Sequence, residues 1–110
     1  MTMHNSYMQN EPSRAQVEAL AAPTLIEFGA PWCGHCRAAQ PLIAEALAVH
    51  PAVDHLKIED GKGRALGRSF RVTLWPTLIC LRQGKEVARL VRPTDARAIE
   101  RTLQQIDAVS

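Results

Sequence analysis

The segment Phe28-Gly29-Ala30-Pro31-Trp32-Cys33-Gly34-His35-Cys36-Arg37 decides how the rest of the chain is interpreted. It joins an apolar run at 24–28 to a stretch in which apolar residues recur at helical spacing, and so predicts a buried strand, a turn and a helix. Two residues separate Cys33 from Cys36, and at a helix start this spacing lets both sulfurs come within bonding distance. The dipole and free N–H groups there favour an anion, so Cys33 is predicted to be the attacking thiolate.

Length and composition indicate one ordinary globular domain. The chain has 110 residues, 46% of them apolar and 22% charged, which is enough for a core and excludes disorder throughout. The net charge is only +2 and the basic residues are scattered, so nucleic acid is not an expected partner. No apolar stretch is long enough to span a membrane, and residues 1–12 lack the pattern of a secretory signal. We therefore expect a cytoplasmic protein with no membrane partner.

Helices and strands are predicted to alternate within a single domain. Residues 1–12 are polar and aperiodic, which predicts a flexible tail ahead of a domain at 13–110. Ser13 and Gln16 form a capping box that opens a first helix, and Pro23 ends it. After the cysteine helix, the pattern indicates strand, short helix, strand, strand and helix at residues 53–58, 65–70, 77–81, 86–91 and 96–106, the last capped by Thr94 or Asp95. This order predicts a mixed sheet between helix layers.

The paired cysteines have one main competing interpretation, which is half of a zinc site. Such a site needs two more ligands at compatible spacing, and only Cys80 and His35 are available, without a second closely spaced pair. A static structural disulfide is rare in the expected compartment. The pattern therefore favours a redox-active dithiol at Cys33 and Cys36, with no metal, and Cys80 is predicted to be a small buried apolar residue.

Two separated motifs resemble the thioredoxin superfamily. Cys33-Gly34-His35-Cys36 is similar to the active site of protein disulfide isomerase domains, and Trp75-Pro76-Thr77 before an apolar run is similar to the family's cis-proline loop and central strand. The resemblance covers roughly residues 13–106 and implies an α/β thioredoxin fold, a mixed sheet of four or five strands flanked by helices on both faces. The strand that usually opens this fold has no convincing counterpart here, so we expect it to be missing or very short.

The resemblance implies a mechanism of thiol-disulfide exchange. Cys33 attacks a target disulfide to form a mixed disulfide, and Cys36 then attacks Cys33 and releases the reduced target. Cys36 must lose a proton at that step, and the family places a buried carboxylate beneath it, which is Glu27 here. A carboxylate is costly to bury in its ionised form, so Glu27 suits proton uptake, unless it lies at a strand edge and faces water. His55 is expected to pair with Glu27 or to be a structural histidine.

Two positions of the first motif depart from common thioredoxins. His35 replaces a proline, and an imidazolium there is expected to favour the Cys33 thiolate, unless the side chain is solvated and without influence. Its effect would be to tune the redox potential. Gly29 replaces a common aromatic residue, which removes a ring from beneath the active-site loop.

The resemblance also implies a substrate surface. The family's loop is cis at the position of Pro76, lies against the cysteines and pairs its backbone with a substrate strand. Trp75 and Trp32 then stand at this surface as peptide anchors or as packing residues. Arg92 replaces a glycine that lines the groove in many relatives, and it either selects acidic targets or is an ordinary solvated arginine.

These observations predict a cytoplasmic thiol-disulfide oxidoreductase that exchanges its dithiol with protein disulfides, as a reductant. A thioredoxin-reductase-like protein or a low-molecular-weight thiol is the expected electron donor, and no further cofactor is needed because the cysteines are the redox centre. The CGHC form favours a potential nearer to about −180 mV than to about −270 mV. A monomer is expected. The alternative is a non-catalytic module of the same fold that binds a partner or handles a metal.

Overall fold

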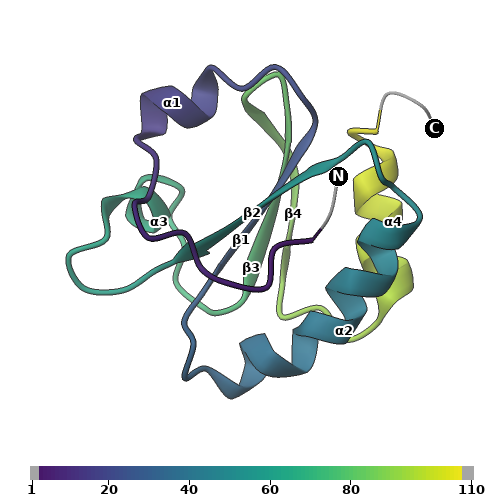
Figure 1. Ribbon diagram of the computed structural model, residues 1–110, viewed down its shortest axis with the longest axis horizontal. Helices are drawn as coiled ribbons and strands as arrows, with labels where there is room; N and C mark the ends of the chain where they lie inside the picture. Colours follow the sequence, from purple (N-terminus) through teal and green to yellow (C-terminus); the bar gives the residue numbers. More distant parts are fainter. Residues whose placement is uncertain (1–2, 108–110) are drawn as a thin grey trace.

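The computed structural model describes residues 3–107 as three layers (Figure 1). In chain order the elements are α1 Arg14–Glu18, β1 Thr24–Gly29, α2 Gly34–Ala48, β2 Asp54–Glu59, α3 Ala65–Ser69, β3 Thr77–Arg82, β4 Lys85–Val91 and α4 Ala96–Gln104. The sheet lies in the middle, with α1 and α3 over one face and α2 and α4 over the other. The predicted order of elements and the α/β thioredoxin fold are confirmed.

The sheet has four strands in the order β2-β1-β3-β4. β1 pairs in parallel with β2 and antiparallel with β3, and β4 pairs antiparallel with β3. Of the two strand counts expected from the sequence, the described residues form the smaller one, without a strand ahead of α1. The central strand β1 leads directly into the cysteine motif, so the pairing of β1 on both sides fixes the position of that motif.

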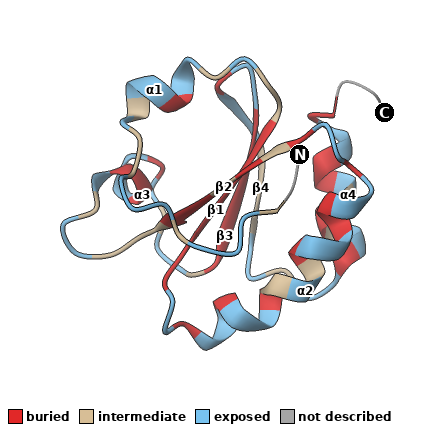
Figure 2. Cartoon of the chain, in the orientation of Figure 1, coloured by how far each residue is buried: buried red, intermediate tan, exposed pale blue. Residues whose placement is uncertain are grey.

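Alternation along β1 divides the core into two clusters, one on each face of the sheet. Ile26 and Phe28 face α1 and α3, while Leu25 faces α2 and α4. The buried residues follow the sheet and the inner sides of the helices (Figure 2). Each large apolar side chain buried in this way contributes about 1.5–3 kcal/mol. On β1, a charged residue, Glu27, falls on the face that carries α2.

Local signals in the sequence account for the helix starts. The Ser13 hydroxyl accepts from the Gln16 N–H at 3.0 Å, and the Ser13 N–H donates to Gln16 Oε1 at 2.9 Å, so the predicted capping box is confirmed. At α4, Asp95 rather than Thr94 is the N-cap, and its carboxylate accepts from the Ala98 N–H at 2.8 Å.

A tight turn at Gln83-Gly84 joins β3 to β4. Both residues have positive φ, 51° and 76°, as a two-residue hairpin turn of the primed type requires. A Cβ at position 84 would also clash with the main-chain oxygen of Glu18. The end of α1 thus packs on the hairpin only because residue 84 is glycine.

The N-terminal residues differ from the expected free tail. Residues 3–12 cross the edge of the sheet at β2 and contact the domain along their length (Figure 1). The Met8 N–H donates to the Lys57 main-chain oxygen at 2.9 Å, and the His4 N–H donates to His55 Nδ1 at 2.9 Å. Glu11 Oε2 accepts from two N–H groups at the start of α3, each at 3.1 Å. Residues 1 and 2 of the expected tail lie outside the described residues.

Candidate active site

The two cysteines of the motif lie at the first turn of α2. Cys33 is the N-cap residue, and its sulfur accepts a hydrogen bond from the Cys36 N–H at 3.1 Å. Cys33 and Cys36 are free thiols in this structure. The N–H groups of the first turn have no partner within the helix, and one of them points at the Cys33 sulfur. This geometry stabilises a thiolate at that sulfur.

Cys36 lies in a less favourable place for a charge. Only 2% of its surface is exposed, against 7% for Cys33. Burial, followed by the hydrogen bond with Cys33, raises the pKa of Cys36 to about 12. Cys36 is then almost entirely a neutral thiol at pH 7. The two thiols are therefore unequal, and Cys36 needs help to become a nucleophile.

Glu27 is fully buried, so the interpretation as a strand-edge glutamate facing water is wrong. Its Oε1 lies 3.0 Å from His55 Nε2, which confirms the pairing considered for that histidine. Its Oε2 accepts from Gln40 Nε2 at 2.6 Å. The charge of Glu27 contributes to the raised pKa of Cys36, so the carboxylate acts electrostatically on the resolving thiol.

The sequence interpretation missed two further members of this polar cluster, Lys57 and Gln40. Lys57 is 6% exposed, stands opposite Glu27 in the β1–β2 register, and donates from Nζ to Gln40 Oε1 at 3.0 Å. The amide of Gln40 thus links the ammonium group to the carboxylate. Gln40 lies four residues after Cys36 and so on the same face of the helix, which could have pointed to it. Lys57 is a charged residue flanked by apolar residues in a predicted strand, which could have marked it as a member of the site.

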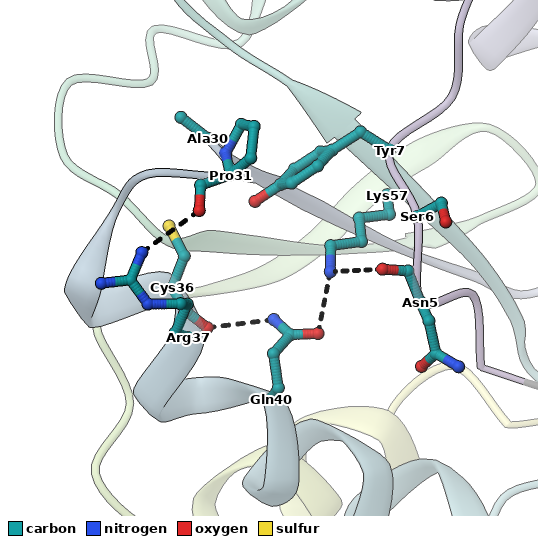
Figure 3. Close-up of a pocket in the computed structure, with 9 residues that line it drawn as sticks. All are labelled: Asn5, Ser6, Tyr7, Ala30, Pro31, Cys36, Arg37, Gln40 and Lys57. Atoms are coloured by element: carbon teal, nitrogen blue, oxygen red, sulfur yellow. Dashed lines mark hydrogen bonds between the residues drawn. The ribbon is translucent and has the colours of Figure 1, made fainter.

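A pocket of about 300 Å³ opens beside Cys36, between α2 and the N-terminal residues (Figure 3). Asn5 and Tyr7 line one side, and Cys36, Arg37 and Gln40 line another. The Tyr7 hydroxyl points toward the Cys36 sulfur (Figure 3). Tyr7 therefore belongs to the site, although nothing local in the sequence predicted it.

The two tryptophans lie together next to the cysteines. Trp75 packs against Ala30 and both cysteines, and its Nε1 donates to Asp60 Oδ2 at 2.9 Å. Trp32 is 70% exposed, and its ring meets that of Trp75 edge to face with 5.2 Å between centroids. The fixed ring of Trp75 therefore supports an exposed ring, a surface suited to a peptide side chain. Asp60 is a further residue that the sequence interpretation missed.

The loop that carries Pro76 lies next to these rings. The Trp75–Pro76 peptide bond is cis. Arg92 adopts a φ of +50°, and its Nε donates to the main-chain oxygen of Trp75 at 2.8 Å. The Arg92 N–H donates to the Pro76 oxygen at 2.9 Å. Arg92 therefore contacts the backbone of the loop itself.

His35, the remaining candidate from the first motif, has an exposed side chain on the first turn of α2.

The rest of the described chain offers no second centre of this kind. Within residues 3–107 there is no group of three or more His, Cys, Asp or Glu side chains placed to hold a metal ion. Cys80 is 1% exposed in β3, and burial raises its pKa to about 12. His50 Nδ1 and Asp107 Oδ2 lie 2.6 Å apart, between the end of α2 and the residues after α4. None of the helices in residues 3–107 is long and apolar enough to cross a membrane.

Comparison with known proteins agrees with this arrangement. The family model described as Thioredoxin matches residues 6–105. The reduced form of thioredoxin 2 from Pseudomonas aeruginosa is 53% identical, with a TM-score of 0.84 over 94% of this chain and 96% of that chain. Thioredoxin NaTrxh from Nicotiana alata is 29% identical, with a TM-score of 0.72 over 86% of this chain and 81% of that chain.

Curated relatives include longer proteins. Human protein disulfide-isomerase A2 is 38% identical over 74% of this chain, which spans 17% of that protein. Thioredoxin H2-1 from Oryza sativa is 31% identical over 78% of this chain, which spans 62% of that protein. The family match extends over nearly the whole described chain and includes both the cysteine motif and the proline loop. The chain therefore belongs to the thioredoxin family of thiol-disulfide oxidoreductases.

Proposed function

We propose that this protein reduces protein disulfides through the Cys33–Cys36 dithiol. The observation that carries the proposal is the inequality of the two thiols. Cys33 caps α2 and accepts a backbone hydrogen bond, whereas Cys36 is buried and has a pKa raised to about 12. One sulfur is prepared to attack and the other is held back as a thiol until it is needed.

In the first step the Cys33 thiolate attacks one sulfur of a target disulfide. A bond forms between Cys33 and that sulfur, the target's S–S bond breaks, and the second target sulfur leaves as a thiolate. Trp32 and Trp75 offer apolar area to the side chains around the target cysteine. The backbone of the Pro76 loop offers hydrogen bonds to an extended target segment.

In the second step Cys36 gives its proton to Glu27 and attacks the Cys33 sulfur. The intramolecular disulfide forms, the mixed disulfide breaks, and the remaining target sulfur is released as a thiolate that takes a proton from water. Glu27 suits this role because its charge acts on Cys36, and Gln40 and His55 hold its two oxygens in place. His35 is proposed to tune the couple by its charge near Cys33.

The finer features of the reaction belong to the same proposal. The thioredoxin and protein disulfide-isomerase names of the relatives support protein disulfides as substrates. A thioredoxin-reductase-like protein or a small thiol would return the electrons in a reducing cytoplasm, with the protein as a monomer that needs no metal or other cofactor.

Reduction of a disulfide-bonded test protein with dithiothreitol as the electron source tests the activity. We expect turnover above the uncatalysed rate, loss of turnover in Cys33→Ser, and a stable mixed disulfide in Cys36→Ser. Cys80→Ser is the matched control, because its sulfur lies in β3 away from the dithiol, and it should retain turnover. Wild-type protein that shows no turnover, with Cys33 intact, would support the binding-module alternative instead.

A further inference from the structure

We propose that Tyr7 completes the active site from the N-terminal residues: its phenol O–H donates a hydrogen bond to the Cys36 sulfur as that sulfur becomes a thiolate. The assignment rests on the dithiol chemistry proposed above and adds to it a donor that lies outside both sequence motifs. Tyr7 and Cys36 line the same pocket, and the hydroxyl points toward the sulfur (Figure 3).

The absence of a side chain at Gly29 makes this contact possible. A Cβ at position 29 would lie 2.5 Å from Cys36 Sγ and 3.1 Å from the Tyr7 hydroxyl oxygen. The sulfur and the hydroxyl therefore border the same small space, which any larger residue at 29 would fill. Tyr7 brings its hydroxyl to this space from a segment 22 residues earlier in the chain.

Contacts with β2 hold Tyr7 in place. The neighbouring Met8 N–H donates to the Lys57 main-chain oxygen at 2.9 Å. Lys57 Nζ donates to the Asn5 main-chain oxygen at 3.2 Å and lies 4.7 Å from the centre of the Tyr7 ring. A cation placed over an aromatic face is attractive, so Lys57 fixes both the backbone and the ring of the segment. The position of the hydroxyl is therefore set before a substrate arrives.

The electrostatics favour a phenol that donates rather than one that ionises. Burial, and then the charges of Cys36, Glu27 and Cys33, hold the pKa of Tyr7 well above its usual range, and a hydrogen bond with Cys36 adds to the effect. The phenol therefore keeps its proton at any pH at which the enzyme works. Burial is the main obstacle to a thiolate at Cys36, and an O–H donor offsets part of the cost of placing that charge in a buried position.

The step in which this donor acts is the release of the target. The Cys36 S–H proton goes to Glu27, the Cys36 sulfur attacks Cys33, and the bond between Cys33 and the target sulfur breaks. The phenol proton stays on Tyr7 throughout, so it stabilises the transient negative charge without being consumed. When the new disulfide has formed, the sulfur no longer carries a charge for the hydroxyl to stabilise.

Tyr7→Phe tests the proposal, because it keeps the ring beside Lys57 and removes only the hydroxyl. In a single-turnover experiment with a preformed mixed disulfide, we expect release to slow by roughly 10- to 150-fold at neutral pH, as for loss of a hydrogen bond to a charged group. Brief alkylation of Cys33 should proceed at the wild-type rate.

Two further measurements separate this role from a structural one. Tyr7 is the only tyrosine of the chain, so global replacement of tyrosine by 3-fluorotyrosine changes this residue alone, and its more acidic phenol should accelerate release. Gln9→Ala, an exposed side chain of the same segment, is the matched control and should leave release unchanged. Equal release rates in wild type and Tyr7→Phe at all pH values would overturn the assignment. A wild type that forms no mixed disulfide would overturn the proposed function instead.

Discussion

Glu27 Oε1 and His55 Nε2 lie 3.0 Å apart, and neither side chain has more than 1% of its surface exposed. They come from adjacent parallel strands, β1 and β2, so the sheet itself holds them together. A carboxylate is buried here with a partner on each oxygen, and it acts on Cys36. Buried ionisable groups with specific partners next to a nucleophile are typical of functional sites.

Glu27→Gln should impair release of the target more than attack by Cys33. The amide cannot take up the Cys36 proton, and general base catalysis usually accounts for about 10²-fold or more in rate. Rapid-quench measurement of release from a mixed disulfide should show a loss on that order, with near-normal alkylation of Cys33. An unchanged release rate would show that the buried pair is structural. His55→Gln provides the control that keeps the carboxylate and changes its partner.

Alkylation of the reduced protein near neutral pH should modify the three cysteines in a fixed order. Cys33 should react first because it is the N-cap of α2 and the most exposed of the three cysteines, whereas burial raises the pKa of both Cys36 and Cys80 to about 12. Cys36 should react slowly, and Cys80 should react only after denaturation. Mass spectrometry of peptides sampled over time measures the order directly. Equal labelling of all three would contradict the assigned roles.

His35→Pro should make the couple more reducing. An imidazolium near the helix start favours the Cys33 thiolate, which exists only in the reduced form. Removing the imidazolium therefore destabilises the reduced form and lowers the redox potential of the couple by roughly 30 mV. Equilibration with glutathione, read by mass, gives the shift. His35→Gln is the matched variant that removes the charge without the stiffness of proline. If His35→Pro alone shifts the potential, the turn and not the charge sets it.

Arg92→Gly should increase kcat/KM for a neutral disulfide peptide several-fold. The Arg92 side chain donates to the Trp75 main-chain oxygen, so its loss frees that acceptor for a substrate N–H group. Stability should change little. Glycine adopts a φ of +50° more readily than arginine, and the resulting gain of about 1 kcal/mol in folding free energy offsets the lost hydrogen bond. Arg71→Gly, at a φ of 58°, is the matched backbone control. A selective loss of activity on acidic peptides would show instead that Arg92 recognises acidic targets.

The reduced protein should lose stability above pH 9. Thiols at Cys36 and Cys80 have folded-state pKa values near 12 and unfolded-state values near 9, so the unfolded state releases protons first as the pH rises. Each group then lowers the free energy of unfolding by up to about 1.4 kcal/mol per pH unit between these values. In the oxidised protein Cys36 no longer titrates, so denaturant melts should show a shallower decline. Cys80→Ala should make the decline shallower still, leaving the contribution of Tyr7, whose pKa is also raised. Identical slopes in both redox forms would contradict this account.

The sequence predicted the elements of the fold because their signals are local. The capping box at Ser13, the apolar run of β1 and the spacing of apolar residues in α4 each involve neighbours within a few positions. Glu27 was identified only through the family resemblance, and the structure added its partners. The bounds of α1 were less accurate, since the helix ends at Glu18, well before Pro23.

Contacts between distant segments account for what the sequence did not reveal. Tyr7 reaches Cys36 across 29 positions of sequence, and no periodicity connects them. The Asp60 carboxylate holds the Trp75 indole from a loop 15 residues away. Residues 3–12 are polar and show no apolar periodicity, so the sequence predicts a tail there. In the structure these residues make hydrogen bonds with β2 and α3.

The position of residues 3–8 has a consequence for how copies of this protein meet in solution. β2 is an edge strand, and an uncovered edge offers unpaired N–H and C=O groups to any other extended chain. The N-terminal residues cross that edge, where the Met8 N–H already occupies the oxygen of Lys57. They shield the strand from intermolecular pairing without adding a strand of their own, so a protein shortened by its first eight residues should aggregate more readily as well as lose the Tyr7 hydroxyl.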